Sequence, residues 1–119
     1  MMLDWNEYRK QLALGVKEVG QLSPETVKGY IELSSASQKA DLLGAKIREL
    51  IALAVAVTAR CDGCITVHAE AAIRHGATKE KIAEALGVAV AVNAGAAFVY
   101  SARAMDAVKE YPHASSPHG

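Results

Sequence analysis

Residues 49–68 decide how this chain folds, and they read ELIALAVAVTARCDGCITVH. The first part of this stretch is apolar on more than one side of a helix, which indicates a helix buried on several sides. The second part places Cys61, Cys64 and His68 at spacings of three and four residues. Because an α-helix completes a turn in about 3.6 residues, the directions of these three side chains lie within about 60° of one another. One helix face therefore carries two thiols and an imidazole.

The composition of the chain suits packed helices. Of its 119 residues 51% are hydrophobic but only 5% are aromatic, so Ala, Val, Leu and Ile have to build the core at close range. No alternation of apolar and polar residues typical of a β-strand occurs along the sequence. A chain of this length forms one domain. We therefore expect a single all-α domain.

Capping and breaking residues divide the chain into about six expected helices. Asp4 and Glu7 have the spacing of a capping box, and Ser23 before Pro24 combines an N-cap residue with a proline at the first helical position. Gly76 is expected to end a helix, and Thr78 to cap the next one. The expected helices cover residues 4–20, 23 to the polar run 34–38, 44–60, 61–75, 78–92 and 96–109, with a break at residues 93–95.

The chain is expected to contain an N-terminal helical segment (residues 1–40), a core (41–110) and a disordered tail (111–119) with two prolines and two serines. Residues 86–102 carry no charge and invite comparison with a membrane span. They are rich in Ala and Gly, however, and are shorter than the roughly 20 apolar residues that a span needs. We expect a helix pair here that is buried in the core or at a subunit interface.

The charge pattern excludes several classes of partner. Thirteen basic residues balance thirteen acidic ones, and no stretch concentrates Lys and Arg. Neither nucleic acid nor an anionic membrane surface is therefore expected as a partner.

Residues 1–10 lack a basic segment followed by an apolar one, so we expect no secretory signal and a cytoplasmic location. In that reducing compartment a Cys-x-x-Cys motif is more often redox-active or metal-binding than structural.

Four residues form the candidate catalytic site. Cys64 falls in the first turn of the helix that begins near Cys61, where unpaired backbone N–H groups and the helix dipole favour a thiolate. His68 lies one turn further along and is placed to take the thiol proton directly or through a water. Glu49 lies among apolar neighbours, where a carboxylate is costly unless it is paired. We expect Glu49 to contact and orient His68, which would give its carboxylate the partner that it needs.

Each of these residues also has a purely structural interpretation. A lone buried cysteine is usually a small hydrophobic residue, His68 alone would be a core histidine, and Glu49 alone a solvated residue or part of a subunit ion pair. A zinc site needs four ligands around one ion, and His75 lies about 10 Å further along the helix axis than His68. We therefore favour redox chemistry and expect no metal. His113 and His118 in the tail receive no role.

The complete pattern is Glu, eleven residues, Cys-x-x-Cys, three residues and His. It resembles the carboxymuconolactone decarboxylase superfamily and, within it, the AhpD-like alkylhydroperoxidases, over roughly residues 41–109. The resemblance implies an all-α fold, assembly into homotrimers or homohexamers, and reduction of hydroperoxides by the cysteine pair. It implies no metal, haem or flavin. Electrons would return from a dithiol donor, a lipoyl or thioredoxin-like protein.

Carried over by position, the resemblance implies that Cys64 attacks the peroxide and that Cys61 resolves the product as a disulfide. Glu49 and His68 would form the proton relay. The best-known peroxidase member has a histidine immediately before the second cysteine, where this chain has Gly63. Two other functions remain open. One is a cofactor-free lyase or isomerase acting on a small acidic compound, and the other is a non-catalytic, redox-sensing oligomer.

Overall fold

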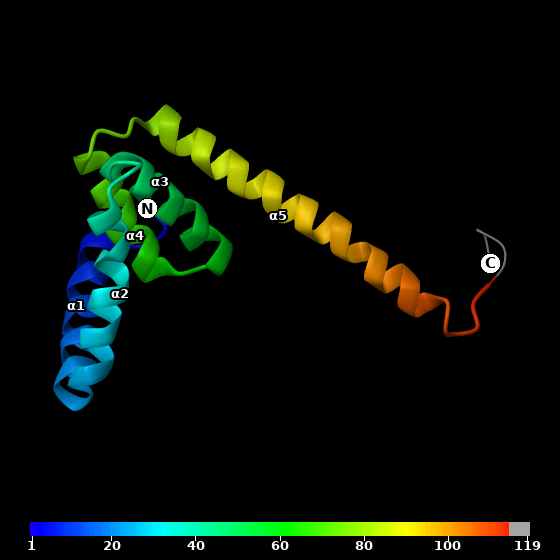
Figure 1. Cartoon of the computed structure of the whole chain (residues 1–119), viewed down its shortest axis with the longest axis horizontal. Coiled ribbons are helices and arrows are strands. Elements are labelled where there is room, and N and C mark those ends of the chain that lie inside the picture. The colour runs from blue at the N-terminus through cyan, green and yellow to red at the C-terminus, as the bar shows by residue number, and fades with distance from the viewer. Residues whose placement is uncertain (115–119) are drawn as a thin grey trace.

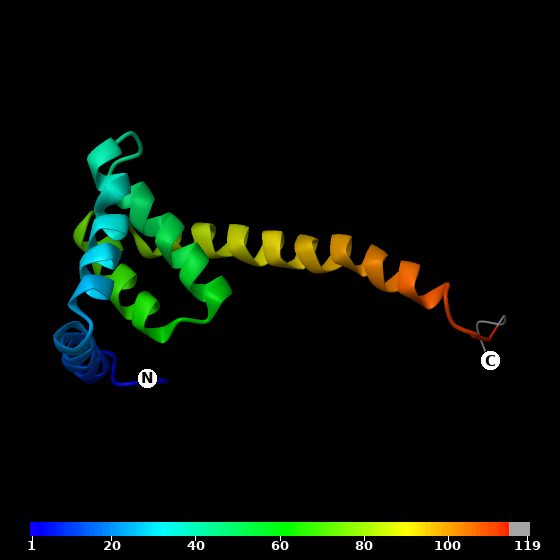
Figure 2. The same cartoon turned by 60° about the horizontal axis from the view of Figure 1, so that its bottom comes forward.

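Five helices make up the part of the chain that the computed structural model describes, residues 1–114. Their bounds are α1 Trp5–Leu22, α2 Pro24–Ala40, α3 Ala45–Ala59, α4 Asp62–Arg74 and α5 Lys79–Val108. α1 and α2 lie beside α3 and α4 and cross each other at a steep angle, since α1 is seen nearly end-on in Figure 2 while α2 runs up the view, and α5 extends far from this body (Figure 1 and Figure 2). No strand occurs within residues 1–114, and the expected all-α fold is confirmed.

The predicted helix starts agree with the structure because capping side chains satisfy the first backbone N–H groups. Asp4 Oδ1 accepts the N–H of Glu7 at 3.1 Å, and Thr78 Oγ1 accepts the N–H of Lys81 at 3.2 Å. The end of α4 is also as predicted. Gly76 adopts a φ of +91° directly after the helix, a conformation that costs glycine little.

The expected end of α2 within residues 34–38 is wrong, because the helix continues to Ala40. The serines of this run bond back into the helix instead of breaking it, as when Ser35 Oγ donates to the carbonyl of Ile31 at 2.9 Å. Asp41 then ends the helix in the left-handed region, with a φ of +48°. Its carboxylate accepts a hydrogen bond from Arg48 of α3 at 2.7 Å, which ties the connection between α2 and α3 to the body.

The expected break at residues 93–95 is also wrong, and the structure has five helices where the sequence predicted about six. The side-chain amide of Asn93 donates to the carbonyl of Ala89 at 2.8 Å and to Thr58 Oγ1 of α3 at 2.9 Å. A glycine within a helix costs about 1 kcal/mol but does not forbid it. A residue read as a helix breaker therefore joins α5 to α3.

The core consists almost entirely of small side chains. Its buried members are Leu53, Ala56, Thr66, Ala71, Ala72, Ala77 and Ala89. Leu53 of α3, Ala72 of α4 and Ala77 in the turn before α5 form one cluster, against which Leu50 and Ile82 also pack. Alanine at the contact lets two helix backbones approach closely, and this proximity positions the functional side chains of α3 and α4.

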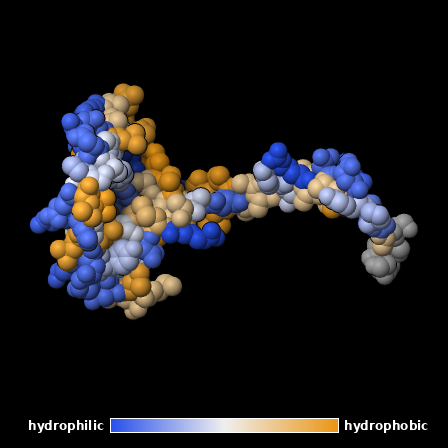
Figure 3. Space-filling view, turned by 90° about the horizontal axis from the view of Figure 1, so that it is seen from below, coloured by the Kyte–Doolittle hydropathy of each residue, from blue (hydrophilic) through white to orange (hydrophobic). Residues whose placement is uncertain are grey.

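The expectation of a buried helix pair over residues 86–102 is wrong for the single chain. These residues belong to one continuous helix, and Ala89 is its buried residue. Phe98 is 82% exposed, and Figure 3 shows apolar surface continuing from the body onto the projecting helix. The radius of gyration is 20.2 Å, compared with about 13–14 Å for a compact chain of this length. One chain offers no second surface that would cover α5.

The length and composition of α5 would allow it to cross a membrane, although core helices of soluble proteins meet the same criterion. Beyond α5, residues 111–114 form no helix, and His113 Nδ1 lies 3.0 Å from the carbonyl oxygen of Tyr111. Residues 115–119, including His118, lie outside the described residues. Disorder of the tail stays a prediction.

Candidate functional site

The two cysteines are joined by a disulfide at the beginning of α4, with their Cα atoms 5.2 Å apart. Cys61 is the N-cap residue of this helix, and its sulfur accepts the backbone N–H of Cys64 at 3.2 Å. The sulfur thus takes the position that a serine or aspartate oxygen usually holds. A thiolate at Cys61 would keep this N–H bond and would also lie at the positive end of the helix dipole.

A tight turn joins α3 to α4 and places Cys61 at the helix start. Arg60 adopts a φ of +54°, its N–H bonds to the carbonyl of Val57 at 3.3 Å, and the N–H of Cys61 bonds to the carbonyl of Ala56 at 3.0 Å. These bonds satisfy the last carbonyls of α3 in a Schellman arrangement. α4 therefore starts immediately after α3 ends, and the two helices pack against each other along the Ala-rich core.

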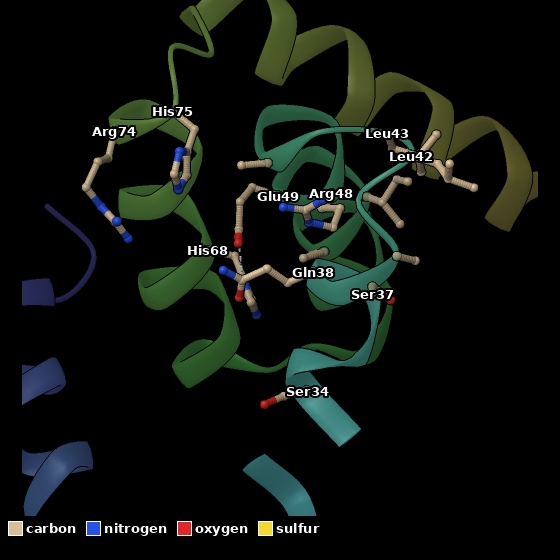
Figure 4. A pocket seen from close by; sticks show the side chains of 14 residues that line it. Ser34, Ser37, Gln38, Leu42, Leu43, Arg48, Glu49, His68, Arg74 and His75 are labelled. Carbon is tan, nitrogen blue, oxygen red and sulfur yellow. Dashed lines mark hydrogen bonds and ion pairs between the residues drawn. The ribbon is translucent and has the colours of Figure 1, made fainter. Parts of the chain in front are cut away.

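The packing of α3 on α4 brings Glu49 and His68 together. His68 Nδ1 lies 2.6 Å from Glu49 Oε2, and the side chains are 33% and 22% exposed (Figure 4). A carboxylate at this distance holds a proton on Nδ1. In the neutral ring Nε2 is then the free acceptor, which is the form that a general base needs.

The structure places Cys64 one helical turn before His68 on α4. Among residues 1–114 it records no hydrogen bond between His68 and either cysteine. In the disulfide neither sulfur carries a proton. His68 therefore has no thiol proton to accept until the disulfide is reduced. All four candidate residues are half-buried: Cys61, Cys64 and His68 lie along the first half of α4, and Glu49 faces them from α3.

A pocket of about 720 Å³ opens beside the Glu49–His68 pair (Figure 4). The end of α2, the following connection, α3 and the end of α4 form its walls. Its lining residues are Ser34, Ser37, Gln38, Ala40, Leu42, Leu43, Ala45, Arg48, Glu49, Ile51, Ala52, His68, Arg74 and His75. Of the four candidate residues, Glu49 and His68 line this pocket and the two cysteines do not.

Arg48 is a pocket residue that the sequence interpretation missed. Its side chain is 20% exposed, and its Nη1 donates to Asp41 Oδ1 at 2.7 Å. The available signal was a charged residue next to Glu49 within a largely apolar helix. Arg74, also on the pocket wall, pairs with Glu70 one turn earlier on α4 at 3.2 Å. His75 ends α4 as its C-cap residue and lines the pocket.

Gly63, between the two cysteines, contacts the N-terminal helix. A Cβ atom at this position would lie 3.0 Å from Leu12 Cδ2 of α1, which is tighter than ordinary van der Waals contact. α1 therefore rests directly on the first turn of α4. The absence of a side chain at Gly63 is what gives α1 room to pack there.

Comparison with known proteins gives consistent matches over most of the chain. The family described as "Carboxymuconolactone decarboxylase family" matches residues 24–107. An uncharacterized protein of Haemophilus influenzae is 46% identical over 107 residues, covering 90% of this chain and 95% of that protein. "Uncharacterized protein 4 in cox locus" of Paracoccus denitrificans is 33% identical over 109 residues, covering 92% and 96%.

A solved structure shares the fold. The crystal structure of apo-lpg0406, a carboxymuconolactone decarboxylase family protein from Legionella pneumophila, has a TM-score of 0.70 to this chain. It is 33% identical in sequence, and the match covers 89% of this chain and 95% of that one.

The contact between Gly63 and Leu12 predicts a specific energetic coupling. Replacing Gly63 by histidine displaces Leu12, and we expect the free energy of unfolding to fall by about 1–3 kcal/mol, as for other overpacked contacts. In a Leu12→Ala background the same replacement costs less, because the smaller side chain leaves space. Urea denaturation of the four proteins at one protein concentration measures this coupling.

Gly29→His is the matched control, because a Cβ at Gly29 of α2 meets nothing within 4 Å. Its effect should not depend on residue 12. If Gly63→His costs the same with and without the Leu12→Ala replacement, the contact is contradicted.

Proposed function

This chain belongs to the carboxymuconolactone decarboxylase family, and from that premise we propose that it is a thiol-dependent hydroperoxidase or disulfide reductase of the AhpD-like kind. The observation that carries the proposal is a Cys61–Cys64 disulfide at the start of α4, one helical turn from a histidine held by a carboxylate. A helix start favours thiolates, and the nearby imidazole is available to move protons.

The oxidative half of the cycle needs both cysteines. The Cys64 thiolate attacks one peroxide oxygen, the O–O bond breaks, and the products are a Cys64 sulfenic acid and an alkoxide, which gains one proton to become the alcohol. The Cys61 thiolate then attacks the sulfenic sulfur and displaces hydroxide, which takes a proton to become water. The 3.2 Å bond from the Cys64 N–H to the Cys61 sulfur supports this resolving role, because it stabilises the attacking thiolate.

His68 and Glu49 would supply the protons of this cycle. In the reduced protein, His68 Nε2 takes the Cys64 proton, and Glu49 stabilises the resulting imidazolium through the 2.6 Å contact at Nδ1. The imidazolium then protonates the departing alkoxide. The pair therefore starts and ends each oxidation in the same protonation state.

The reductive half returns two electrons from an external dithiol, for which we propose a lipoyl or thioredoxin-like protein. One donor thiolate attacks the Cys64 sulfur, and Cys61 leaves as a thiolate. Cys61 is the better leaving group because the N–H of Cys64 still bonds to its sulfur. The second donor thiol then closes the donor's own disulfide and releases reduced Cys64. Metal, haem and flavin take no part in this cycle.

One observation favours a second candidate function. The pocket is lined by Glu49 and His68 but not by the cysteines. A carboxylate and an imidazole beside such a pocket are the equipment of acid–base catalysis, as in a cofactor-free lyase or isomerase. Activity of this kind would survive replacement of both cysteines, whereas the peroxidase activity would not.

We further propose that the chain works as a cytoplasmic homotrimer or homohexamer in which α5 packs against neighbouring subunits. The exposed apolar surface of α5 supports this, since monomers rarely leave such large patches uncovered. Among its exposed residues are Val88, Val90, Val92, Phe98, Val99 and Tyr100. Closed symmetry would let every subunit cover its neighbour's helix in the same way.

The proposed cycle predicts that the protein consumes tert-butyl hydroperoxide with dihydrolipoamide as donor and that the double cysteine variant does not. The single variants should differ. Cys61→Ser accumulates a sulfenic acid on Cys64, because the resolving thiol is missing, and Cys64→Ser forms none. Dimedone trapping followed by mass spectrometry identifies the modified residue.

Two outcomes would overturn this assignment. Equal peroxide consumption by the wild type and the double variant would end the peroxidase proposal. A dimedone adduct on Cys61 in Cys64→Ser, with none on Cys64 in Cys61→Ser, would reverse the roles of the two cysteines.

The proton relay makes a separate prediction. Glu49→Gln and His68→Gln should each slow peroxide consumption by about 10²–10⁴-fold, the usual range for general acid–base groups. Because the two residues act on one proton in series, the double variant should be little slower than the slower single variant. In both, the pH at which iodoacetamide alkylation of Cys64 reaches half its maximal rate should move upward.

Glu70→Gln on the same helix serves as the control for the relay, because Glu70 pairs with Arg74 and not with His68. It should leave the alkylation profile in place. Unchanged profiles and turnover in Glu49→Gln and His68→Gln would leave these residues with a structural role alone.

The role of α5 is tested by the mass of the protein in solution. Sedimentation at micromolar concentration should give a trimer or hexamer of the 12.5 kDa chain without detergent. Phe98→Glu should weaken the assembly because it places a charge on the apolar surface, whereas Phe98→Leu should preserve it. A 12.5 kDa monomer, or a protein that is dispersed only in detergent, would contradict the proposed assembly.

A further inference from the structure

Arg48 is a half-buried cation on the wall of the pocket that also contains Glu49 and His68 (Figure 4). Its side chain is 20% exposed, although it lies on a helix that is otherwise mostly apolar. A guanidinium has five N–H donors in one plane. Among residues 1–114 the structure records one acceptor for them, Asp41 Oδ1, which lies 2.7 Å from Nη1.

The contact with Asp41 positions the guanidinium more than it neutralises it. Asp41 is 65% exposed, so water screens its charge strongly. It ends α2 and approaches Arg48 through a single nitrogen, which leaves the other donors of the guanidinium for a second acceptor. None of the described residues has a side-chain nitrogen or oxygen that is buried without a partner, so these donors are open to the pocket. A ligand that brings an anionic oxygen would replace water on them and form charge-assisted hydrogen bonds.

The other pocket walls indicate the rest of the ligand. Leu42 and Leu43 in the connection after α2, together with Ile51 of α3, give the pocket an apolar side, and Gln38 of α2 adds a neutral polar group. Arg48 of α3 and the Glu49–His68 pair line the same pocket. An acceptor for Arg48, an apolar body and a reacting group at His68 can therefore belong to one molecule.

We propose that Arg48 binds the carboxylate of an acidic organic substrate whose hydrocarbon part lies against the leucines and whose reacting group extends past His68 toward Cys64, one helical turn away on α4. Planar carboxylates match the guanidinium in a two-bond geometry that neutral esters lack. The inference rests on the proposed function for the identity of the reacting group, which makes the substrate class a hydroperoxy carboxylic acid. Arg48 is a specificity residue in this scheme and takes no part in the electron transfer.

A binding experiment tests the carboxylate site without any turnover. Titration calorimetry of the full-length protein compares a medium-chain hydroxy carboxylic acid, the reduced form of such a substrate, with its methyl ester. The wild type should bind the acid about tenfold more tightly or better, the effect expected for charge-assisted hydrogen bonds. Arg48→Gln should remove the preference and Arg48→Lys should keep part of it, whereas Asp41→Asn should change it little, because the asparagine oxygen still accepts from Arg48 and the lost charge was screened by water.

Arg60→Gln is the matched control, because Arg60 ends the same helix but does not line the pocket. It should keep the full preference for the acid. Equal binding of acid and ester by the wild type would overturn the inference before any variant is made. Preference for the acid in Arg48→Gln, shown to be folded by circular dichroism, would also overturn it.

A kinetic comparison separates this inference from the proposed function. The ratio of kcat/KM for the hydroperoxy acid to that for its methyl ester should be about ten or more in the wild type and near one in Arg48→Gln. Turnover of both hydroperoxides at equal efficiency would keep the peroxidase and reject the carboxylate site. A protein that turns over neither compound but binds the hydroxy acid through Arg48 would reject the peroxidase and keep the site.

Discussion

The close packing of α3 on α4 is the contact on which the rest of this structure depends. Ala56 of α3 and Ala72 of α4 are buried, and Leu53 is the largest side chain among the buried residues. Small side chains let the two backbones approach, and this proximity brings a carboxylate on one helix within 2.6 Å of an imidazole on the other. The tight turn between the helices also places the cysteine pair at the start of α4. The packing of α3 on α4 therefore forms the core and also positions the residues of the site.

Three features of the site each favour a particular protonation or charge state of a side chain. The first turn of α4 offers a backbone N–H to the Cys61 sulfur. Glu49 holds a proton on one nitrogen of His68 and frees the other. Arg48 carries a fixed positive charge into the pocket beside them. None of these groups is fully buried, so the site combines partial desolvation, which strengthens the electrostatic interactions, with access for reactants.

The small core and the long exposed helix both mean that a single chain buries little apolar surface. A chain whose buried residues are mostly alanine gains little apolar burial per residue, and α5 leaves many Val, Phe and Tyr side chains uncovered. At about 25 cal/mol per Å² of apolar surface removed from water, that uncovered surface is a large reserve of stabilisation. If copies of the chain associate as proposed, this apolar surface is buried between subunits, and the assembly then stabilises the fold.

The sequence by itself determined the helical class, most helix starts and the common helix face of Cys61, Cys64 and His68. These follow from local rules, because capping pairs such as Asp4 with Glu7 act within one turn and the spacing of Cys61, Cys64 and His68 sets a common face. Tertiary structure decided the rest. The sequence predicts a break at Asn93, yet this residue lies within α5, where Thr58 of α3 accepts a hydrogen bond from its side-chain amide. The pairing of Glu49 with His68 was expected, but its 2.6 Å distance depends on how two separate helices meet. The place of Arg48 in the pocket and the packing of α1 on Gly63 depend on the same kind of contact, which no local sequence pattern specifies.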